Sequence, residues 1–180
     1  MQSLRTELGA EILNREDKII RMIPFRPCHS LLKQFIQLIA VQVSQSDRNI
    51  KSVDGTEYAT GVGAANFRSA AGVGVTNYGM QIGSGETTVA MSDYGLETQL
   101  TTNISHLATI VAEEHPDADT WRMAITRGFL NNTGAPVAVK EVGWVSFNAT
   151  KATLLDRTLY PVSFVAGETL MLTYRLTITL

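Results

Sequence analysis

The chain has 180 residues, enough for one well-buried core with or without an accessory arm, and we expect one main domain. Hydrophobic residues make up 44% of the chain and charged residues 18%, a composition that excludes disorder as the dominant state. The formal net charge is -2 and the Lys and Arg residues are scattered. Because phosphate binding needs concentrated basic residues, nucleic acid is not an expected partner.

The sequence shows no signal for secretion or for membrane insertion. Residues 1–14 contain Arg5, Glu7 and Glu11 and lack the uninterrupted apolar core of a signal peptide. No apolar run approaches the roughly 18 residues of a membrane helix. We therefore expect a protein that is made and folded in a cytoplasm, with no membrane partner. Cys28 is the only cysteine, so it is expected to be a small buried residue, the alternative being an intermolecular crosslink.

Residues 1–48 are predicted to form a helical N-terminal arm. Apolar residues recur there at roughly three to four residues among charges, the spacing of an amphipathic helix: Leu4, Leu8, Ile12, Ile19 and Met22. Pro24 and Pro27 would end this helix, because proline lacks the backbone donor and restricts the residue before it. A second helix is predicted to follow Ser30, a candidate N-cap, and to continue to Val43.

The second predicted helix is apolar on much of its circumference. It is too short to span a bilayer and too apolar to stay alone in water, so it must pack on the main domain or on a neighbouring subunit. The sequence therefore predicts an assembly interface made by Leu31, Leu32, Phe35, Ile36, Leu38 and Ile39.

Residues 49–180 are predicted to form a β-sandwich domain. Gly, Thr, Val and Asn are frequent there, and short alternating runs are separated by turn signals, as in antiparallel sandwiches and barrels. Strands are predicted from Trp121 to the turn at residues 131–134, and over residues 137–147, 154–159, 161–165 and 170–180. The strand over 137–147 has apolar groups on both faces and is expected to be central. The last strand is expected to bury one face and expose a mostly polar one.

Several polar clusters suggest chemistry but fit no catalytic or metal-binding motif. The glycines of residues 61–85 do not form a phosphate-binding loop, because no GxxxxGK[ST] is present, and they are expected in turns and sheet contacts. The acidic cluster lacks the order of a Ca²⁺ loop and is expected to be a solvated loop. Its members are Glu113, Glu114, His115, Asp117 and Asp119.

Other candidate groups are isolated in the sequence. Asp93 and Glu97 resemble an acid and base pair, but they are expected to be turn and cap residues. No histidine stands in a nucleophile or metal motif, and the three are His29, His106 and His115. Six aromatic residues are expected in the core or at interfaces, with a sugar-stacking platform as the alternative: Tyr78, Tyr94, Trp121, Trp144, Tyr160 and Tyr174. We therefore predict no catalytic residue, no metal site and no cofactor.

Two stretches carry a family resemblance. Residues 78–88, YGMQIGSGETT, continue through SDYGLE at residues 92–97, and residues 126–144 read TRGFLNNTGAPVAVKEVGW. Residues 155–174 add LDR, PV, AGETL and TY in the same order. Together these segments resemble a recurrent pattern in structural proteins of tailed bacteriophages and cover about 60% of the chain. Trp144 stands where that pattern more often has a smaller apolar residue.

The resemblance implies a virion protein with a jelly-roll-like β-sandwich and no catalytic residues. Its partners would be other virion proteins and copies of itself, assembled in the bacterial host cytoplasm. We expect a position at the head surface, neck or collar of the particle. The alternatives are a tail or baseplate component, or a glycan-binding module for host attachment.

Overall fold

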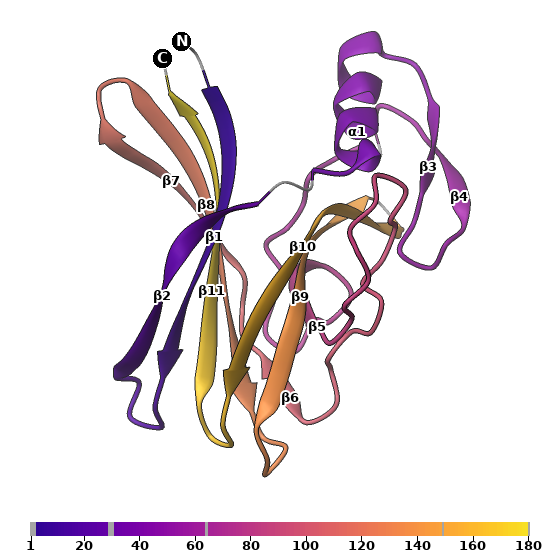
Figure 1. Ribbon diagram of the computed structural model, residues 1–180. Helices are drawn as coiled ribbons and strands as arrows, with labels where there is room; N and C mark the ends of the chain where they lie inside the picture. Colours follow the sequence, from indigo (N-terminus) through magenta and orange to yellow (C-terminus); the bar gives the residue numbers. More distant parts are fainter. Residues whose placement is uncertain (1–2, 29–30, 64, 149, 180) are drawn as a thin grey trace.

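A computed structural model describes residues 3–28, 31–63, 65–148 and 150–179 (Figure 1). The main sheet has the order β2, β1, β11, β8, and the far edge of β8 pairs with both β7 and β6. These strands are β1 (Ser3–Leu13), β2 (Ile19–Cys28), β6 (Ile104–His106), β7 (Ile110–Asp117), β8 (Thr120–Asn131) and β11 (Thr169–Thr179).

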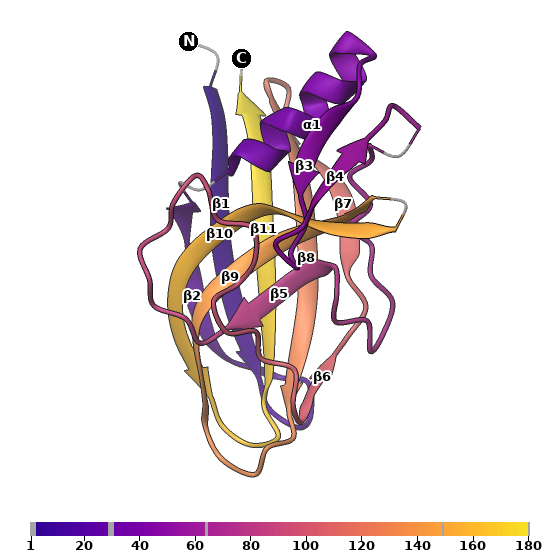
Figure 2. The same cartoon turned by 90° about the vertical axis from the view of Figure 1, so that its right-hand side faces the viewer.

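A second, three-stranded sheet has the order β10, β9, β5 and packs on one face of the main sheet, which we call the inner face. Figure 2 shows its strands crossing in front of the main sheet. They are β5 (Gly79–Gly83), β9 (Val137–Asn148) and β10 (Lys151–Phe164). A small hairpin, β3 (Arg48–Lys51) and β4 (Glu57–Thr60), lies beside the helix α1 (Lys33–Ser44).

The predicted antiparallel β-sandwich is confirmed, because the strands of both sheets pair antiparallel and the sheets share one core. The connections from β8 to β9 and from β10 to β11 pass from one sheet to the other, which joins the two layers. In the described part of the chain, no helix has the length and apolar character to cross a membrane.

The C-terminal strands agree closely with the prediction. β9 lies between β10 and β5, as its two apolar faces indicated. The two predicted strands around Pro161 form one strand, β10, because Pro161 lies in a register shift between Leu159 and Val162 where no ladder hydrogen bond is required of it. The turns at residues 131–134 and 166–168 both form as predicted.

The first predicted helix is wrong, because β1 and β2 form a hairpin in its place. β1 pairs with β11 from Ser3 opposite Thr179 to Leu13 opposite Thr169, so this segment belongs to the main sheet. The predicted helical arm over residues 1–48 therefore reduces to α1. A spacing of four residues between apolar side chains also equals two periods of a strand, which explains the error.

The second predicted helix is confirmed as α1. Ser30, the predicted N-cap, lies outside the described residues, and the helix begins after Leu32, which makes no side-chain cap bond. Gln45 ends the helix in a left-handed conformation with φ of 53°. Ring contacts join α1 to both sheets. The ring centroid of Phe35 lies 5.9 Å from that of Trp144 of β9, which in turn lies 5.4 Å from the ring centroid of Tyr174 of β11.

Candidate functional site

A buried ion network joins the loop after β5 to the second sheet. Glu141 of β9 is fully buried. Its Oε1 accepts the backbone N–H groups of Gly85 and Thr98 at 3.1 and 3.0 Å. Its Oε2 accepts Nε of Arg157 at 2.7 Å and the N–H of Glu97 at 3.2 Å. Four donors therefore occupy this carboxylate, and none of its oxygens is left free for a reacting group.

Arg157 of β10 brings the two predicted carboxylates, Asp93 and Glu97, into the same network. Its Nη1 donates to Oδ2 of Asp93 at 2.8 Å, and its Nη2 lies 3.8 Å from Oε2 of Glu97. Asp93 also accepts the N–H of Ala90, and Glu97 accepts the N–H groups of residues 86 and 87. Both residues thus have the turn and cap roles that the sequence predicted.

The electrostatics of this network favour fixed charges. Hydrogen bonds from Thr87 and Glu86 hold the pKa of Glu97 below its usual range against a smaller opposing effect of burial. Burial opposes the charge of Arg157, but its hydrogen bonds to Glu141 and Asp93 raise the pKa of the guanidinium above its ordinary value. A general acid or base must exchange a proton near neutral pH. The network is therefore built for rigidity.

Arg127 is a second buried arginine within the segments that carry the family resemblance. It is fully buried between the sheets. It donates to the carbonyls of Leu107, Tyr78 and Met80 at 2.9, 3.1 and 2.9 Å, and also to the carbonyl of Val75. Burial lowers the pKa of Arg127 to about 10, so it stays protonated near neutral pH. The side chain therefore clamps the first residues of β5 to the irregular backbone before β5 and after β6.

A third buried group, Asp156 of β10, has no cation beside it among the described residues. Thr158 donates to its Oδ1 at 2.9 Å and Tyr174 donates to its Oδ2 at 3.2 Å. Burial raises the pKa of Asp156 to about 6. Cys28 is buried nearby, as predicted, and its own burial followed by the charge of Asp156 raises the pKa of the thiol to about 12. The sequence offered no sign of this cluster.

The predicted acidic loop is instead a hairpin. Residues 113–117 lie on β7, and Pro116 lies in a register shift between Glu114 and Asp117. Glu114 faces Arg122 at 3.2 Å and Arg175 at 3.8 Å, whereas Glu113 has His115, at 3.4 Å, as its one ionic partner within the described chain. No group of three acidic, His or Cys ligands that could hold a metal occurs among the residues that the structure describes.

The histidines do not meet at a site. His29 lies outside the described residues. His106 is buried, with Nε2 3.1 Å from the carbonyl of Leu100, and burial followed by the nearby charge of Arg127 lowers its pKa. His115 is exposed and packs on Trp121 at 3.8 Å between ring centroids. None of the described histidines contacts a nucleophile.

Most of the six aromatic residues belong to the core. Tyr78, Trp144, Tyr160 and Tyr174 are buried, as the core interpretation predicted. Of the six, only Trp121 and Tyr94 are exposed. Trp121 lies on β8, and Tyr94 lies on the loop after β5, where it contacts Lys51.

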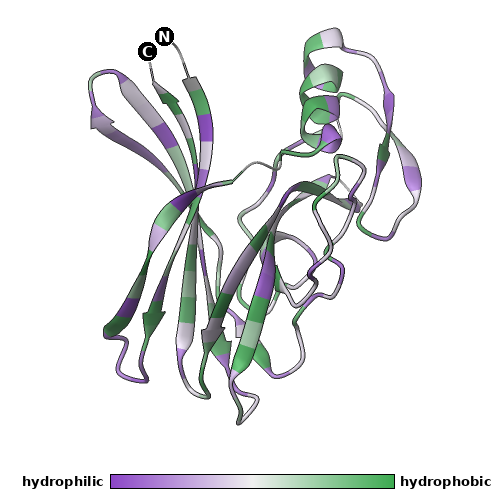
Figure 3. Ribbon diagram, in the orientation of Figure 1, coloured by the Kyte–Doolittle hydropathy of each residue, from purple (hydrophilic) through white to green (hydrophobic). Residues whose placement is uncertain are grey.

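An apolar cleft opens where the main sheet extends beyond the second sheet. One part, about 460 Å³, is lined by Val111, Glu113, Trp121, Met123, Leu176 and Ile178, with Ala112 and Arg122 beside them. An adjoining part, about 300 Å³, shares three of these residues and reaches Phe35 and Ile39 of α1. We call the two parts together the apolar cleft. Hydrophobic residues lie on both α1 and the upper strands (Figure 3).

The cleft leaves large apolar side chains in contact with water. Trp121 is 56% exposed and Ile178 is 51% exposed, and Leu4, paired opposite Ile178 on β1, is 58% exposed. All three continue the rows of inner-face side chains that are buried farther down the sheet. The alternation predicted for the last strand therefore holds, but its upper end has no covering layer.

The structure divides the predicted assembly interface into two groups. Leu32, Phe35 and Leu38 are buried within the chain, which is the first of the two packing arrangements that the sequence allowed. They pack on the sandwich because α1 lies on β10 and β3. Ile36 and Ile39 are exposed, and Leu31 is half-buried. Of the exposed residues, Ile39 lines the apolar cleft.

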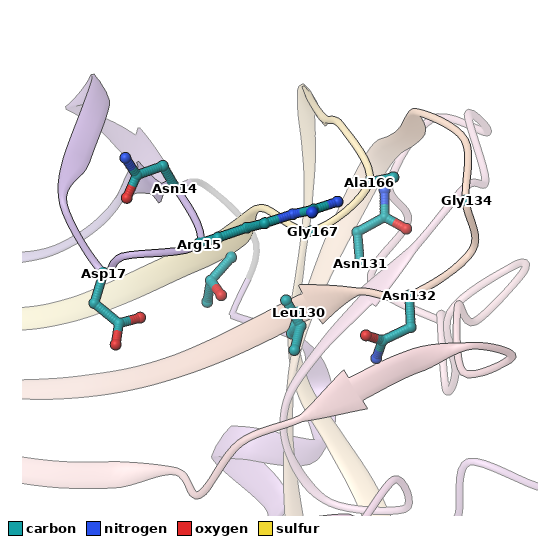
Figure 4. A pocket seen from close by; sticks show the side chains of 10 residues that line it. Asn14, Arg15, Asp17, Leu130, Asn131, Asn132, Gly134, Ala166 and Gly167 are labelled. Atoms are coloured by element: carbon teal, nitrogen blue, oxygen red, sulfur yellow. The ribbon is translucent and has the colours of Figure 1, made fainter.

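A polar hollow of about 490 Å³ lies between three turns at the other end of the sandwich. Figure 4 shows the Arg15 side chain extending across it toward Gly167, with Asn131 and Asn132 on the far side. Among the described lining residues the one hydroxyl is that of Thr169, and no histidine or cysteine lies beside it there. The asparagines hold the turn after β8, where Asn131 donates to the carbonyls of residues 135 and 164.

Comparisons of the chain with family models, with curated proteins and with solved structures find no match.

Proposed function

We propose that this chain is a structural component of a tailed phage virion, at the head surface, neck or collar, and that it acts through protein–protein contacts. The apolar cleft is the observation that carries the proposal. A subunit that stays alone in water gains nothing by leaving Trp121, Ile178 and Leu4 exposed beside one another on one face. Contiguous exposed apolar surface of this kind marks a site of protein contact. The segments that resemble phage structural proteins are the reason for proposing that this contact is made in a phage particle.

The arrangement of the polar residues supports a structural role over an enzymatic one. The side chains that most resemble catalytic groups, Asp93, Glu97 and Glu141, all bind backbone N–H groups and Arg157. Buried and saturated networks of this kind rigidify a fold. A subunit that must fit its neighbours without changing shape benefits from that rigidity.

Sedimentation velocity of the purified chain tests the proposal. We expect the wild-type chain to form species larger than a monomer at micromolar concentrations, and Trp121→Lys to shift the distribution toward the monomer. Val73→Lys is the matched control, because Val73 is exposed but lies outside the cleft. A wild-type chain that remains monomeric up to hundreds of micromolar would contradict the proposal.

A further inference from the structure

The exposed apolar residues gather in a second place besides the cleft, along the edge strand β2. Met22 is 70% exposed, Ile20 is 53% exposed, and Ile19 and Phe25 are exposed beside them. Figure 2 shows β2 and β7 at opposite edges of the main sheet. One molecule therefore presents a protruding apolar strand at one edge and an apolar hollow at the other.

The two places carry opposite charges. Residues 19–28 include Arg21 and Arg26 and no acidic residue. Arg21 donates to the carbonyl of Ser163, and Arg26 lies 5.2 Å from the centre of the Tyr160 ring. Among the described residues neither arginine has a carboxylate partner, so both keep an unneutralised charge at this edge.

The hairpin beside the cleft is acidic. The hairpin of β7 and β8 carries Glu113, Asp117 and Asp119. Within the described residues, none of these carboxylates pairs with a Lys or an Arg, and Glu113 has only His115. Glu114 differs, because Arg122 and Arg175 already neutralise it.

We infer that the apolar cleft of one copy receives the β2 edge of a second copy, so that subunits join head to tail. The inference rests on the proposed function and names the partner of its contact surface. Met22 and Phe25 would enter the apolar cleft, and Arg21 and Arg26, on the side of β2 that faces β10, would meet the acidic hairpin at the rim, as in other complementary interfaces. Cleft against cleft, or β2 against β2, would place like charges together.

The contact uses side chains and does not extend the sheet. Pro24 and Pro27 remove backbone donors from β2, and Pro116 removes one from β7, which is how edge strands avoid unwanted ladder pairing. A head-to-tail contact repeats from copy to copy. It therefore generates a closed ring or an open filament, whereas a two-fold contact would stop at a dimer.

Two blocked variants test this arrangement. Ile20→Glu with Met22→Glu blocks the β2 edge and leaves the cleft intact, whereas Trp121→Lys with Ile178→Lys blocks the cleft and leaves β2 intact. We expect each variant alone to sediment as a monomer, and an equimolar mixture to form a heterodimer that grows no further. Val73→Lys, outside both surfaces, should assemble like the wild type. Circular dichroism melting confirms that each variant is folded.

A charge exchange gives a second test that leaves the apolar residues in place. Glu113→Lys alone and Arg26→Glu alone should each weaken self-association at least tenfold, and mixing the two chains should restore it. Assembly of the β2-blocked variant at the wild-type level, or mixtures that remain monomeric, would overturn the inference. If the cleft-blocked variant loses assembly and the β2-blocked variant does not, the proposed function stands and the inference about β2 fails. A monomeric wild-type chain would contradict both.

Discussion

Replacing Arg127 with methionine removes the guanidinium that clamps four backbone carbonyls. Each buried carbonyl left without a donor costs about 1–3 kcal/mol. The loss of four is therefore worth roughly 4–12 kcal/mol before any water enters. The opposing effect is relief from burying a charge. A pKa lowered from 12.5 to about 10 corresponds to about 3 kcal/mol at 1.36 kcal/mol per unit. The difference leaves a net destabilisation of about 4 kcal/mol, allowing for partial rescue by water.

Urea unfolding of Arg127→Met against wild type measures this change, followed by tryptophan fluorescence and by circular dichroism. Arg5→Met is the matched control, because Arg5 is exposed on β1 and lies 3.8 Å from Glu7, so its loss should cost less than about 0.5 kcal/mol. The loss of unfolding free energy in Arg127→Lys should lie between the losses in Arg127→Met and Arg5→Met, since an ammonium cannot reach all the carbonyls placed around a planar fork. A loss below about 1 kcal/mol for Arg127→Met would refute the clamp.

Two further substitutions and one labelling reaction test other buried positions. Asp156→Asn should stabilise the fold at pH 7 by up to about 3 kcal/mol and should lose this advantage near pH 4. The folded pKa of about 6 lies above the ordinary 3.8, so the wild type is stabilised when Asp156 is protonated and loses that stability as the pH rises through 6. If the free energy of unfolding depended on pH equally in the wild type and in Asp156→Asn, this reasoning would be contradicted. Gly83→Ala should lower the free energy of unfolding by at least about 2 kcal/mol, since its Cβ would lie 2.7 Å from the carbonyl oxygen of Thr98. Gly63→Ala is the control and should be neutral in the same thermal melts, because its Cβ would meet nothing within 4 Å. Cys28 should react with iodoacetamide at pH 8 only after unfolding, because burial raises its thiol pKa to about 12, and rapid labelling of the folded chain would show that the thiol is accessible.

The sequence predicted the elements whose local pattern has a single interpretation. β11 alternates over eleven residues, β9 is a run with apolar groups on both faces, and the turns at residues 131–134 and 166–168 come before them, so both strands were predicted. α1 was predicted because its apolar residues follow no period of two. β1 was missed because Leu4, Leu8 and Ile12 fit either period. Its true partner, β11, lies more than 150 residues away in the chain.

The polar networks depend on contacts that no local pattern contains. Glu141 meets Arg157 across 16 positions, and Arg157 meets Asp93 across 64. Their roles appear only once the loop after β5 lies on the second sheet. The exposed part of the predicted interface was also hidden in the sequence. Which side of α1 faces the sandwich depends on the position of β10, so Ile39 and Leu38 looked equivalent.

The position of the chain in a purified particle tests the central claim most directly. If a tailed phage encodes the chain, as we propose, mass spectrometry and cryo-electron microscopy of its particles give the copy number and the density of the chain. We expect many copies at the head surface, neck or collar, with each apolar cleft covered by a neighbouring subunit. Particles that are complete and infectious without the chain, or a chain whose cleft faces solvent in every copy, would contradict the account.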